Sequence, residues 1–315
     1  MKRGLITWDK TELPPEVFQR RLVVVRRVLA ERQLPALVVY SDLWRSNEAR
    51  FFANYMPYFN RALLILPVEG MPTLLCGLSP RTYRWIQSVT PIEDVRPAGN
   101  FAKPLGEVAA ERGWTKVGVL NAGQLPYDLS QALHGGTVEL VNVESEAVFH
   151  PANDDHEIAM RRKAAAMARA ALDEELPAGV GKIDHEFVGQ LERRLRLAGA
   201  EDLVILLTNG DTAPGPAHGK KLQEGYSVSI ALEYRGHWVR MSMTEAFRNP
   251  ELIPSGPPDI LNEPVHEALS GSYPYECGHD EGFSANHQEL YDHETERGFL
   301  MGDTSWHGPK GWEVL

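Results

Sequence analysis

The chain has 315 residues, of which 43% are hydrophobic and 24% are charged, as in ordinary soluble globular proteins. This length is about twice that of a typical domain, so we expect two domains, each with its own core. The formal net charge of −11 argues against nucleic acid or an anionic membrane surface as the main partner. All of this excess lies in residues 251–315, where 13 acidic residues accompany only Arg297 and Lys310.

The sequence carries no export or membrane signal that we recognise. A basic pair, Lys2 and Arg3, is followed by charged residues from Asp9 onward, where a signal peptide needs an apolar run. The longest apolar runs, at 34–40 and 62–66, are far shorter than the roughly 18 residues of a membrane span. Cys76 and Cys277 lie far apart and form no Cys-x-x-Cys pair, which argues against a disulfide framework or a thiolate metal site. We therefore expect a cytoplasmic protein with no membrane partner.

The first half alternates short apolar runs with stretches of helical character. Apolar side chains at helical spacing predict a helix over residues 16–33. Strands are predicted at 36–40, 62–66, 73–76, 116–120 and 138–143, and helices near 80–89, 104–112 and 126–133. This alternation predicts an α/β domain over residues 1–150, with helices packed on a sheet.

A turn-rich stretch at 148–155 marks the boundary to a second domain, residues 151–315. Asp154 and Glu157 have the spacing of a capping box, so we expect a helix to begin there and to end near Leu176, before Pro177. A second helix is expected from a cap at Asp184 to Gly199.

Three strands should follow, at 202–208, 227–234 and 237–247, with Arg235 and Gly236 as the turn of a hairpin between the last two. Side chains alternate between the faces of a strand. In the hairpin of 227–234 and 237–247, one face should therefore carry mainly apolar side chains and the other a mixture of polar, charged and apolar ones. The mixed face holds Ser229, Ala231, Glu233, Trp238, Arg240, Ser242 and Thr244. Prolines between 250 and 264 predict that no long element follows residue 250.

The order of these elements resembles the creatinase/aminopeptidase P family, whose catalytic domains have the pita-bread fold. The segments that carry the resemblance are 50–55, 156–172 and 222–247. The resemblance implies a creatinase-like α/β N-terminal domain, followed by an α+β pita-bread domain over residues 151–315. It also implies a homodimer.

Peptidases of this family hold two divalent metals with two Asp, one His and two Glu. By resemblance, Ala231 and Arg240 stand where the two Asp belong, His279 matches the His, and Thr304 stands at the first Glu. A methyl group and a guanidinium cannot bridge two hard cations, so we expect no metal and no other cofactor. The chain is also short between residues 249 and 271, which predicts a trimmed pita-bread domain.

Creatinase works without metal, and His218 matches its catalytic His by resemblance. A neutral imidazole can move a proton at physiological pH. The carboxylate positions of creatinase fall at Ser242 and Thr304, so Glu233 is the nearest substitute. The leading hypothesis is a metal-independent hydrolase of a C–N bond in a small carboxylate-bearing substrate or a short peptide. His218, Glu233 and His279 would be catalytic, and Arg240 and Ser242 would bind the substrate.

Other interpretations of the same residues stay open. His218 is equally well explained as an exposed loop residue, and Arg240 as the partner of Glu233 in an ion pair across the hairpin. A catalytically inactive relative, kept as a binding or interaction module, is the alternative from a different class. A third is a metallopeptidase whose ligands lie in the acidic, His-rich tract 279–296, although that tract has no recognised ligand spacing.

Overall fold

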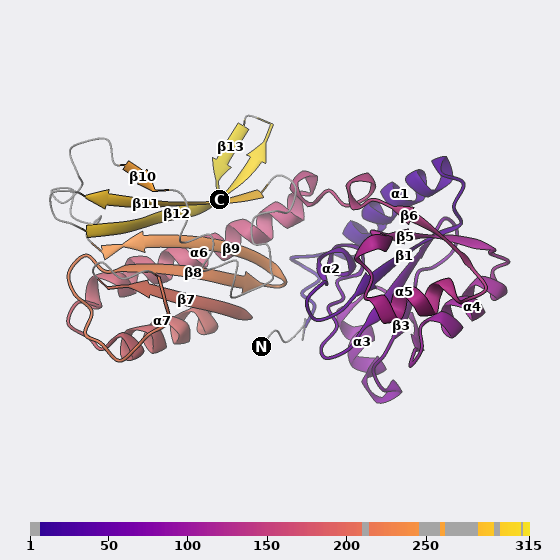
Figure 1. The fold of residues 1–315 in the computed structure, drawn as a ribbon, viewed down its shortest axis with the longest axis horizontal. Coiled ribbons are helices and arrows are strands. Elements are labelled where there is room, and N and C mark those ends of the chain that lie inside the picture. The colour runs from indigo at the N-terminus through magenta and orange to yellow at the C-terminus, as the bar shows by residue number, and fades with distance from the viewer. Residues whose placement is uncertain (1–6, 210–213, 246–258, 262–282, 293–296, 310) are drawn as a thin grey trace. The chain divides into compact units, whose positions relative to one another are not determined.

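The computed structural model describes residues 7–209, 214–245, 259–261, 283–292, 297–309 and 311–315 (Figure 1). The chain divides into two compact units, residues 2–150 and residues 151–315. Each unit has its own sheet and its own buried apolar core.

The first unit is a six-stranded mixed sheet with helices on both faces (Figure 1). Its strands are β1 (Ala36–Ser41), β2 (Ala62–Pro67), β3 (Thr73–Cys76), β4 (Asp94–Pro97), β5 (Lys116–Leu120) and β6 (Glu139–Val143), in the order β4-β3-β2-β1-β5-β6. Its helices are α1 (Pro15–Glu31), α2 (Asn47–Ala53), α3 (Tyr83–Val89), α4 (Ala102–Glu111) and α5 (Tyr127–His134). All the predicted elements are present, whereas α2 and β4 were not predicted.

Two apolar layers account for this arrangement. On one face of the sheet, Val25 and Leu29 of α1 and Ile86 of α3 pack against side chains such as Leu64. On the other face, side chains of α4 and α5 pack against the alternate residues of the same strands, among them Val38. Helices that cover both faces bury the strands completely, which explains why they are continuous apolar runs.

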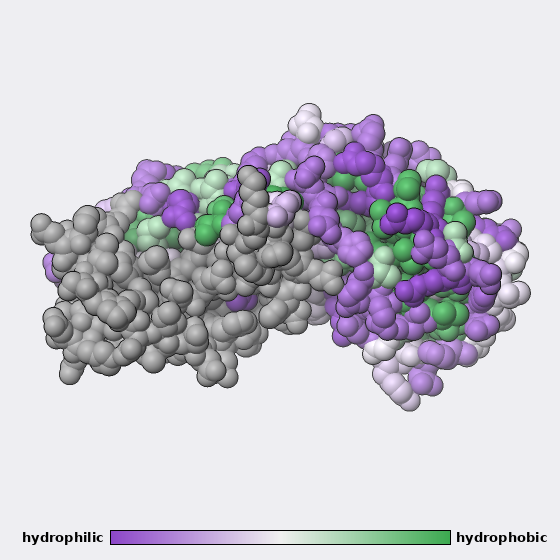
Figure 2. All heavy atoms as spheres, turned by 90° about the horizontal axis from the view of Figure 1, so that it is seen from above, coloured by the Kyte–Doolittle hydropathy of each residue, from purple (hydrophilic) through white to green (hydrophobic). Residues whose placement is uncertain are grey.

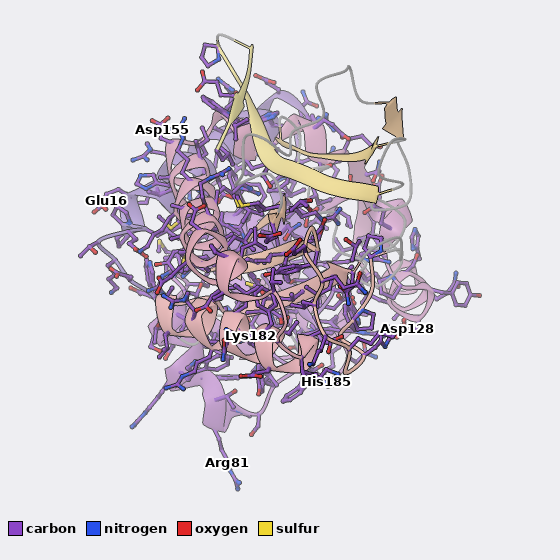
Figure 3. All side chains as sticks on the ribbon, turned by 90° about the vertical axis from the view of Figure 1, so that its left-hand side faces the viewer. Glu16, Arg81, Asp128, Asp155, Lys182 and His185 are labelled. Carbon is purple, nitrogen blue, oxygen red and sulfur yellow. The ribbon has the colours of Figure 1, made fainter. Side chains whose placement is uncertain are left out.

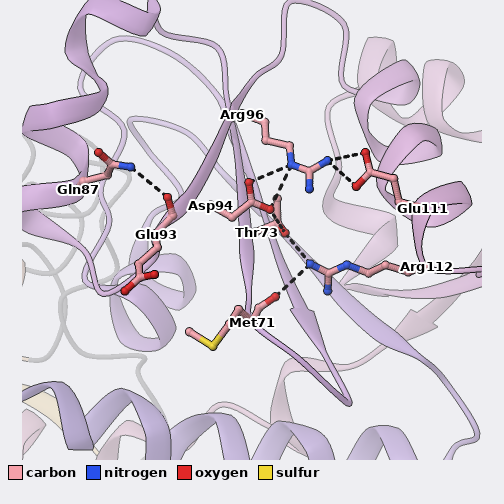
Figure 4. Close-up of polar contacts among 8 residues, drawn as sticks. All are labelled: Met71, Thr73, Gln87, Glu93, Asp94, Arg96, Glu111 and Arg112. Carbon is pink, nitrogen blue, oxygen red and sulfur yellow. Dashed lines mark hydrogen bonds and ion pairs between the residues drawn. The ribbon is translucent and has the colours of Figure 1, made fainter.

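A polar network ties the sheet edge to α4 (Figure 4). Arg96 contacts the carboxylates of Asp94 and Glu111, at 2.9 and 2.8 Å. The hydroxyl of Thr73 donates to Asp94, and it accepts a hydrogen bond from Arg112. Burial acts to raise the pKa of Asp94, but Arg96 and Thr73 outweigh it and hold this pKa below its usual value. Charged hydrogen bonds thus anchor the edge strand β4, in addition to the packing of Val95 against the core.

The second unit is an antiparallel sheet with two helices packed on one face (Figure 1). The helices are α6 (Asp155–Glu175) and α7 (Asp184–Ala198). The strands are β7 (Asp202–Thr208), β8 (Ser227–Tyr234), β9 (His237–Thr244), β10 (Asp259–Leu261), β11 (Phe283–Asp292), β12 (Arg297–Gly308) and β13 (Gly311–Val314). The sheet order is β10-β11-β12-β9-β8-β7, and β13 pairs with β12.

The prediction of no long element after residue 250 is wrong. Strands β11 and β12 form a hairpin in which ten residue pairs face one another, from Phe283 and Trp306 to Asp292 and Arg297. The prolines behind that prediction all precede residue 265, so they place no limit on strands that begin at Phe283. The hairpin joins the sheet where Gly302 of β12 pairs with Ser242 of β9.

Helix α6 begins as predicted, but without a capping box. The carboxylate of Asp154 accepts hydrogen bonds from the backbone N–H groups of His156 and Glu157, so Asp154 is the cap. Glu157 does not return a bond to the backbone N–H of Asp154, which donates to Pro151 instead.

Glu157 points its carboxylate into the interior between α6 and the hairpin. It is fully buried, and its Oε2 lies 3.0 Å from Nη1 of Arg161 and 3.1 Å from Nε2 of His237. The Nδ1 atom of His237 faces the carbonyl oxygen of Tyr234 at 3.3 Å. Nearby, Lys163 donates to the hydroxyl of Tyr234 at 2.7 Å. These polar contacts clamp the turn of the hairpin onto α6.

Hydrophilic residues make up most of the visible surface of the first unit in Figure 2. Its apolar residues are concentrated in the two layers beside the sheet. None of the described helices is long and apolar enough to cross a membrane.

The core of the second unit generates a direct test on α7. Leu191 is fully buried against the sheet, whereas Leu197 on the same helix is 79% exposed. Leu191→Ala should lower the free energy of unfolding by about 2–5 kcal/mol, because it removes buried methyl groups and leaves a cavity. Leu197→Ala is the matched control and should change this free energy by less than about 0.5 kcal/mol. Urea denaturation followed by circular dichroism measures both, and equal effects would contradict this packing.

Candidate functional site

The hairpin of β8 and β9 has two chemically different faces. Val228, Ile230 and Leu232, with Val239 and Met241, belong to the core cluster that includes α6 and α7 side chains. The alternate residues lie on the opposite face, as the sequence predicted. The turn has positive φ at Arg235 and Gly236, 48° and 80°, which matches the twist of a two-residue hairpin.

The register arranges the second face, which we call the polar face, into rows of neighbouring residues. From the turn end of the hairpin, these rows are Asp202–Glu233–Trp238, Val204–Ala231–Arg240, Leu206–Ser229–Ser242 and Thr208–Ser227–Thr244. The hydroxyls of Ser229 and Ser242 are hydrogen-bonded to each other, and those of Ser227 and Thr244 lie 2.6 Å apart. All the members of these rows on β8 and β9 are buried.

Arg240 occupies the centre of the polar face. Its side chain is 4% exposed, and its Nε atom has no hydrogen-bond partner among the described residues. Its backbone is held by Thr304, whose Oγ1 accepts from the N–H of Arg240 at 2.7 Å and donates to its carbonyl oxygen at 2.9 Å. Within the described ranges, no ion pair joins Arg240 to Glu233. The structure therefore presents a buried guanidinium and not the ion pair with Glu233 that was the alternative interpretation of Arg240.

Ser242 lies in the row next to that of Arg240, and Thr304 lies on β12, two residues after Gly302, which pairs with Ser242. Ser242 is thus placed, with Arg240, on the face where the sequence analysis expected substrate binding. Its hydroxyl contacts Ser229 across the hairpin, so it already has one hydrogen-bond partner.

Glu233 lies at the turn end of the polar face, opposite Asp202 of β7. Both residues are buried. Alternation along β8 singles out Glu233 but not Asp202, because only the strand register places the two residues opposite each other. An Asp at the first residue of a predicted strand was the one available signal.

His218 lies at the other end of the hairpin. Its loop is paired with the end of β7, since the backbones of Gly215 and Leu207 exchange two hydrogen bonds, and Leu207 faces Val228 near the start of β8. Glu233 is five residues beyond Val228 on β8, which corresponds to about 17 Å along the strand at the usual rise. His218 is exposed. The register therefore places the loop of His218 and Glu233 toward opposite ends of β8.

Asp184 holds the His218 loop rather than acting as a helix cap. The residue before it, Ile183, has the cap position of α7. The Asp184 carboxylate accepts hydrogen bonds from the backbone N–H groups of His218 and Gly219, each at 2.8 Å, and from that of His185 at 2.7 Å. Figure 3 shows His185 in this first turn of α7, and its imidazole lies against Gly219.

These contacts set the pKa of Asp184. Burial acts to raise it, but hydrogen bonds from the backbone of His218, Lys220, Gly219 and His185 outweigh burial and lower it. The negative charge of this carboxylate therefore stabilises the loop.

His279, the third predicted catalytic residue, lies outside the described residues. The tract 279–296 is described only over β11, and there as backbone. Among the described residues, no group of three or more His, Cys, Asp and Glu side chains could hold a metal ion.

No protein-family model matches the sequence, and no curated protein matches it. Several solved structures do match. The Xaa-Pro dipeptidase from Bacillus anthracis has a TM-score of 0.65 and 16% identity, over 94% of this chain and 97% of that chain. The X-Pro aminopeptidase from Thermotoga maritima has a TM-score of 0.65 and 14% identity, over 93% of this chain and 96% of that chain. The prolidase from Pyrococcus furiosus has a TM-score of 0.64 and 14% identity, over 93% of this chain and 98% of that chain.

The chain has the pita-bread fold of these peptidases. This confirms the predicted architecture, an α/β N-terminal domain followed by a pita-bread domain. The predicted trimming between residues 249 and 271 falls outside the described residues, apart from β10.

The polar face does not fit the two metals that the pita-bread resemblance implies. Ala231 and Arg240, the positions assigned to the two Asp ligands, face each other in one row. A methyl group offers no ligand, and a guanidinium repels a cation. The one carboxylate pair on the described polar face, Asp202 and Glu233, lies in the next row.

Asp184 generates a pH-dependent test. Because its pKa is lower in the folded state, its contribution to stability is complete above its unfolded pKa of about 3.9 and is lost as the pH falls through the folded value. Asp184→Asn should therefore reduce the free energy of unfolding at pH 7, on the order of 1–3 kcal/mol, and by less at pH 3.

Asp155→Asn is the matched control, because Asp155 is the exposed first residue of α6. Chemical denaturation at the two pH values measures both variants. A destabilisation by Asp184→Asn that is the same at pH 3 and pH 7 would rule out the ionic role of this carboxylate.

Proposed function

We propose that this protein binds the carboxylate of a small molecule or short peptide at Arg240, without a metal ion. The observation that carries this proposal is the buried guanidinium of Arg240, which has no ion pair among the described residues and an Nε atom without a hydrogen-bond partner there. A buried charge without a counter-charge is costly, so an anionic ligand would stabilise this arrangement.

The chemistry of the side chain supports a carboxylate as the ligand. A guanidinium presents its N–H groups in a planar fork that matches the two oxygens of a carboxylate. The neighbouring row adds the hydroxyls of Ser229 and Ser242, which can rearrange to donate to a bound ligand. Ala231, opposite Arg240, contributes only a methyl group, which limits the competing polar groups around the guanidinium.

This proposal is consistent with a pita-bread protein that has lost its peptidase metals. Arg240 would supply, as part of the chain, the positive charge that a metal supplies in the two-metal peptidases. Elemental mass spectrometry of the purified protein tests directly whether the site is free of metal. Stoichiometric Mn, Zn or Co that chelator treatment removes would contradict a metal-free site and favour the His-rich tract 279–296 as a source of ligands.

Replacement of Arg240 should abolish carboxylate binding. We expect saturable binding of pentanoate to the wild-type protein in NMR titrations, and at least a tenfold higher Kd for Arg240→Met, because the fork and its charge are removed. Arg240→Lys should be intermediate, since it keeps the charge but not the fork.

Arg193→Met is the control, because Arg193 is an exposed residue of α7. Circular dichroism establishes that each variant is folded. Unchanged pentanoate affinity in a folded Arg240→Met protein would sink the proposal.

Hydrolysis of a C–N bond in the bound ligand is the second candidate function. One observation favours it: the loop of His218 is fixed by hydrogen bonds from the backbone of His218 and Gly219 to the buried Asp184 carboxylate, while His218 itself is exposed. In this reaction His218 would accept a proton from water as its oxygen attacks the carbon, and the leaving nitrogen would receive that proton when the C–N bond breaks. The solved structures of this fold named above are X-Pro peptidases, so Xaa-Pro dipeptides are the first substrates to test, followed by creatine.

His218→Ala should reduce any measured turnover of these substrates by about 100- to 10,000-fold, the usual contribution of a general acid/base residue. His185→Ala is the matched control, because His185 is exposed and lies beside the same loop. Product release is followed by mass spectrometry. A rate that His218→Ala leaves unchanged would exclude His218 as the proton shuttle, and binding without turnover by the wild-type protein would leave the ligand-binding function alone.

We also propose that the protein is a homodimer, on the basis of the family resemblance. We propose a cytoplasmic location because the sequence shows no export signal and no disulfide framework. Light scattering coupled to size-exclusion chromatography tests the first of these.

A further inference from the structure

A pocket of about 410 Å³ lies in the first unit, and the proposed function does not use it. Its lining comes from the end of α1 and the start of β1, from the residues that follow β2, and from the segment before β5. Pockets for small molecules usually have volumes of roughly 300–1,000 Å³, with apolar walls and a few polar groups. This pocket has the size of such a site, and its walls indicate the class of ligand.

Apolar side chains form most of the walls. Leu29, Leu34, Pro35 and Val68 supply aliphatic surface, and Trp114 supplies part of an indole ring. Leu29 and Leu34 are buried in the core of the unit, and Trp114 packs against the second apolar layer. The walls are therefore held by the packing of the whole unit, and the apolar part of a ligand would meet preformed surfaces.

The indole of Trp114 suits a flat ligand better than a cation. The guanidinium of Arg112 lies over this ring, with Cζ 5.1 Å from the ring centroid. Arg112 is held there by the carbonyl oxygen of Met71 and the hydroxyl of Thr73 (Figure 4). The ring thus already has a cation beside it, and what it offers a ligand is apolar area for ring packing.

The polar group at the mouth of the pocket is the carboxylate of Glu69. It is exposed, and it forms no ion pair among the described residues. Arg26 donates instead to the carbonyl oxygens of Pro67 and Gly70, on either side of Glu69 in the chain. The carboxylate is therefore available to a positively charged ligand group.

The carboxyl end of α1 adds to the preference for a positive charge. Pro35 has no N–H to donate to the carbonyl oxygen of Glu31, four residues earlier. Unpaired carbonyl groups at this end of a helix carry partial negative charge, which favours cations. Helix α1 has no basic residue in its last turn, and Arg32, its cap, is exposed to water.

We propose that this pocket binds a small aromatic amine. The ring of the ligand would pack against the aliphatic walls and Trp114, and its ammonium group would lie at Glu69 and the carboxyl end of α1. All the lining residues belong to the first unit, so the site is independent of Arg240 and of the proposed function. Because an exposed carboxylate contributes little, the apolar walls would supply most of the affinity.

Tryptamine and tryptophol are matched probes, because they share the indole ring and the linker and differ in an ammonium or a hydroxyl group. Neither has a carboxylate, so the site at Arg240 is not involved. NMR titration should show saturable shifts at the lining residues, including the indole N–H of Trp114. The Kd of tryptamine should be about threefold lower than that of tryptophol, the effect expected of one exposed ion pair.

Two variants separate the walls from the charge. Glu69→Gln should remove the preference for tryptamine and leave the Kd of tryptophol unchanged. Ala30→Trp should raise both Kd values about tenfold or more, because Ala30 lines the pocket and is exposed, so a large side chain fills the space without entering the core. Glu16→Gln is the control, at the exposed first turn of α1, and should change neither Kd. Circular dichroism establishes that each variant is folded.

Each other outcome overturns part of the inference. Titrations with no saturable shifts at the lining residues would exclude the site. Equal affinities for tryptamine and tryptophol in the wild-type protein would refute the amine assignment. Shifts at the same residues when the protein is concentrated without ligand would show that a second copy fills the pocket, and would overturn the small-molecule assignment. None of these results bears on carboxylate binding at Arg240, which pentanoate tests separately.

Discussion

The constraint on which the pita-bread domain depends is the alternation of side chains along β8 and β9. The apolar residues of the two strands must pack against α6 and α7. The alternate residues therefore lie on the opposite face, and the register of the strands is fixed. A shift of the register by a single residue would move the apolar set away from the helices. The core therefore fixes where Arg240 and the two carboxylates lie, although none of the three belongs to it.

Most of the fold was predictable, because it depends on local patterns. Apolar periodicity and apolar runs located α1, α7 and the strands of the first sheet other than β4. The cap at Asp154 and Pro177 bounded α6, and the Arg235–Gly236 turn identified the hairpin. The interpretation of individual polar residues was less successful. Asp184 has the chemistry of a helix cap and is the first residue of α7, yet its oxygens bind a loop that lies more than 30 residues away in the sequence.

The site was predictable as a face but not as a set of partners. Alternation correctly grouped Glu233, Arg240 and Ser242, since it depends only on parity within one strand pair. Alternation says nothing about a pairing of His218 with Glu233, because loop geometry determines at which end of a strand a loop residue lies. Asp202 was missed for the complementary reason, because its neighbour across the sheet depends on the register with a third strand. The hairpin β11–β12 escaped prediction because a proline disrupts regular structure only at its own position and its immediate neighbours.

The clamp between α6 and the hairpin turn has a consequence for the order in which the domain assembles. Glu157 and His237 are 80 positions apart, and the carboxylate between Arg161 and His237 is shielded from water. A charged group can leave solvent at acceptable cost only when its partners arrive with it. Helix α6 can therefore form alone, but it cannot settle on the sheet until the chain has turned at Arg235 and Gly236 and brought His237 into position. Docking of this helix and closure of the hairpin are thus one cooperative event, which joins the first helix of the domain to the strands that carry its binding residues.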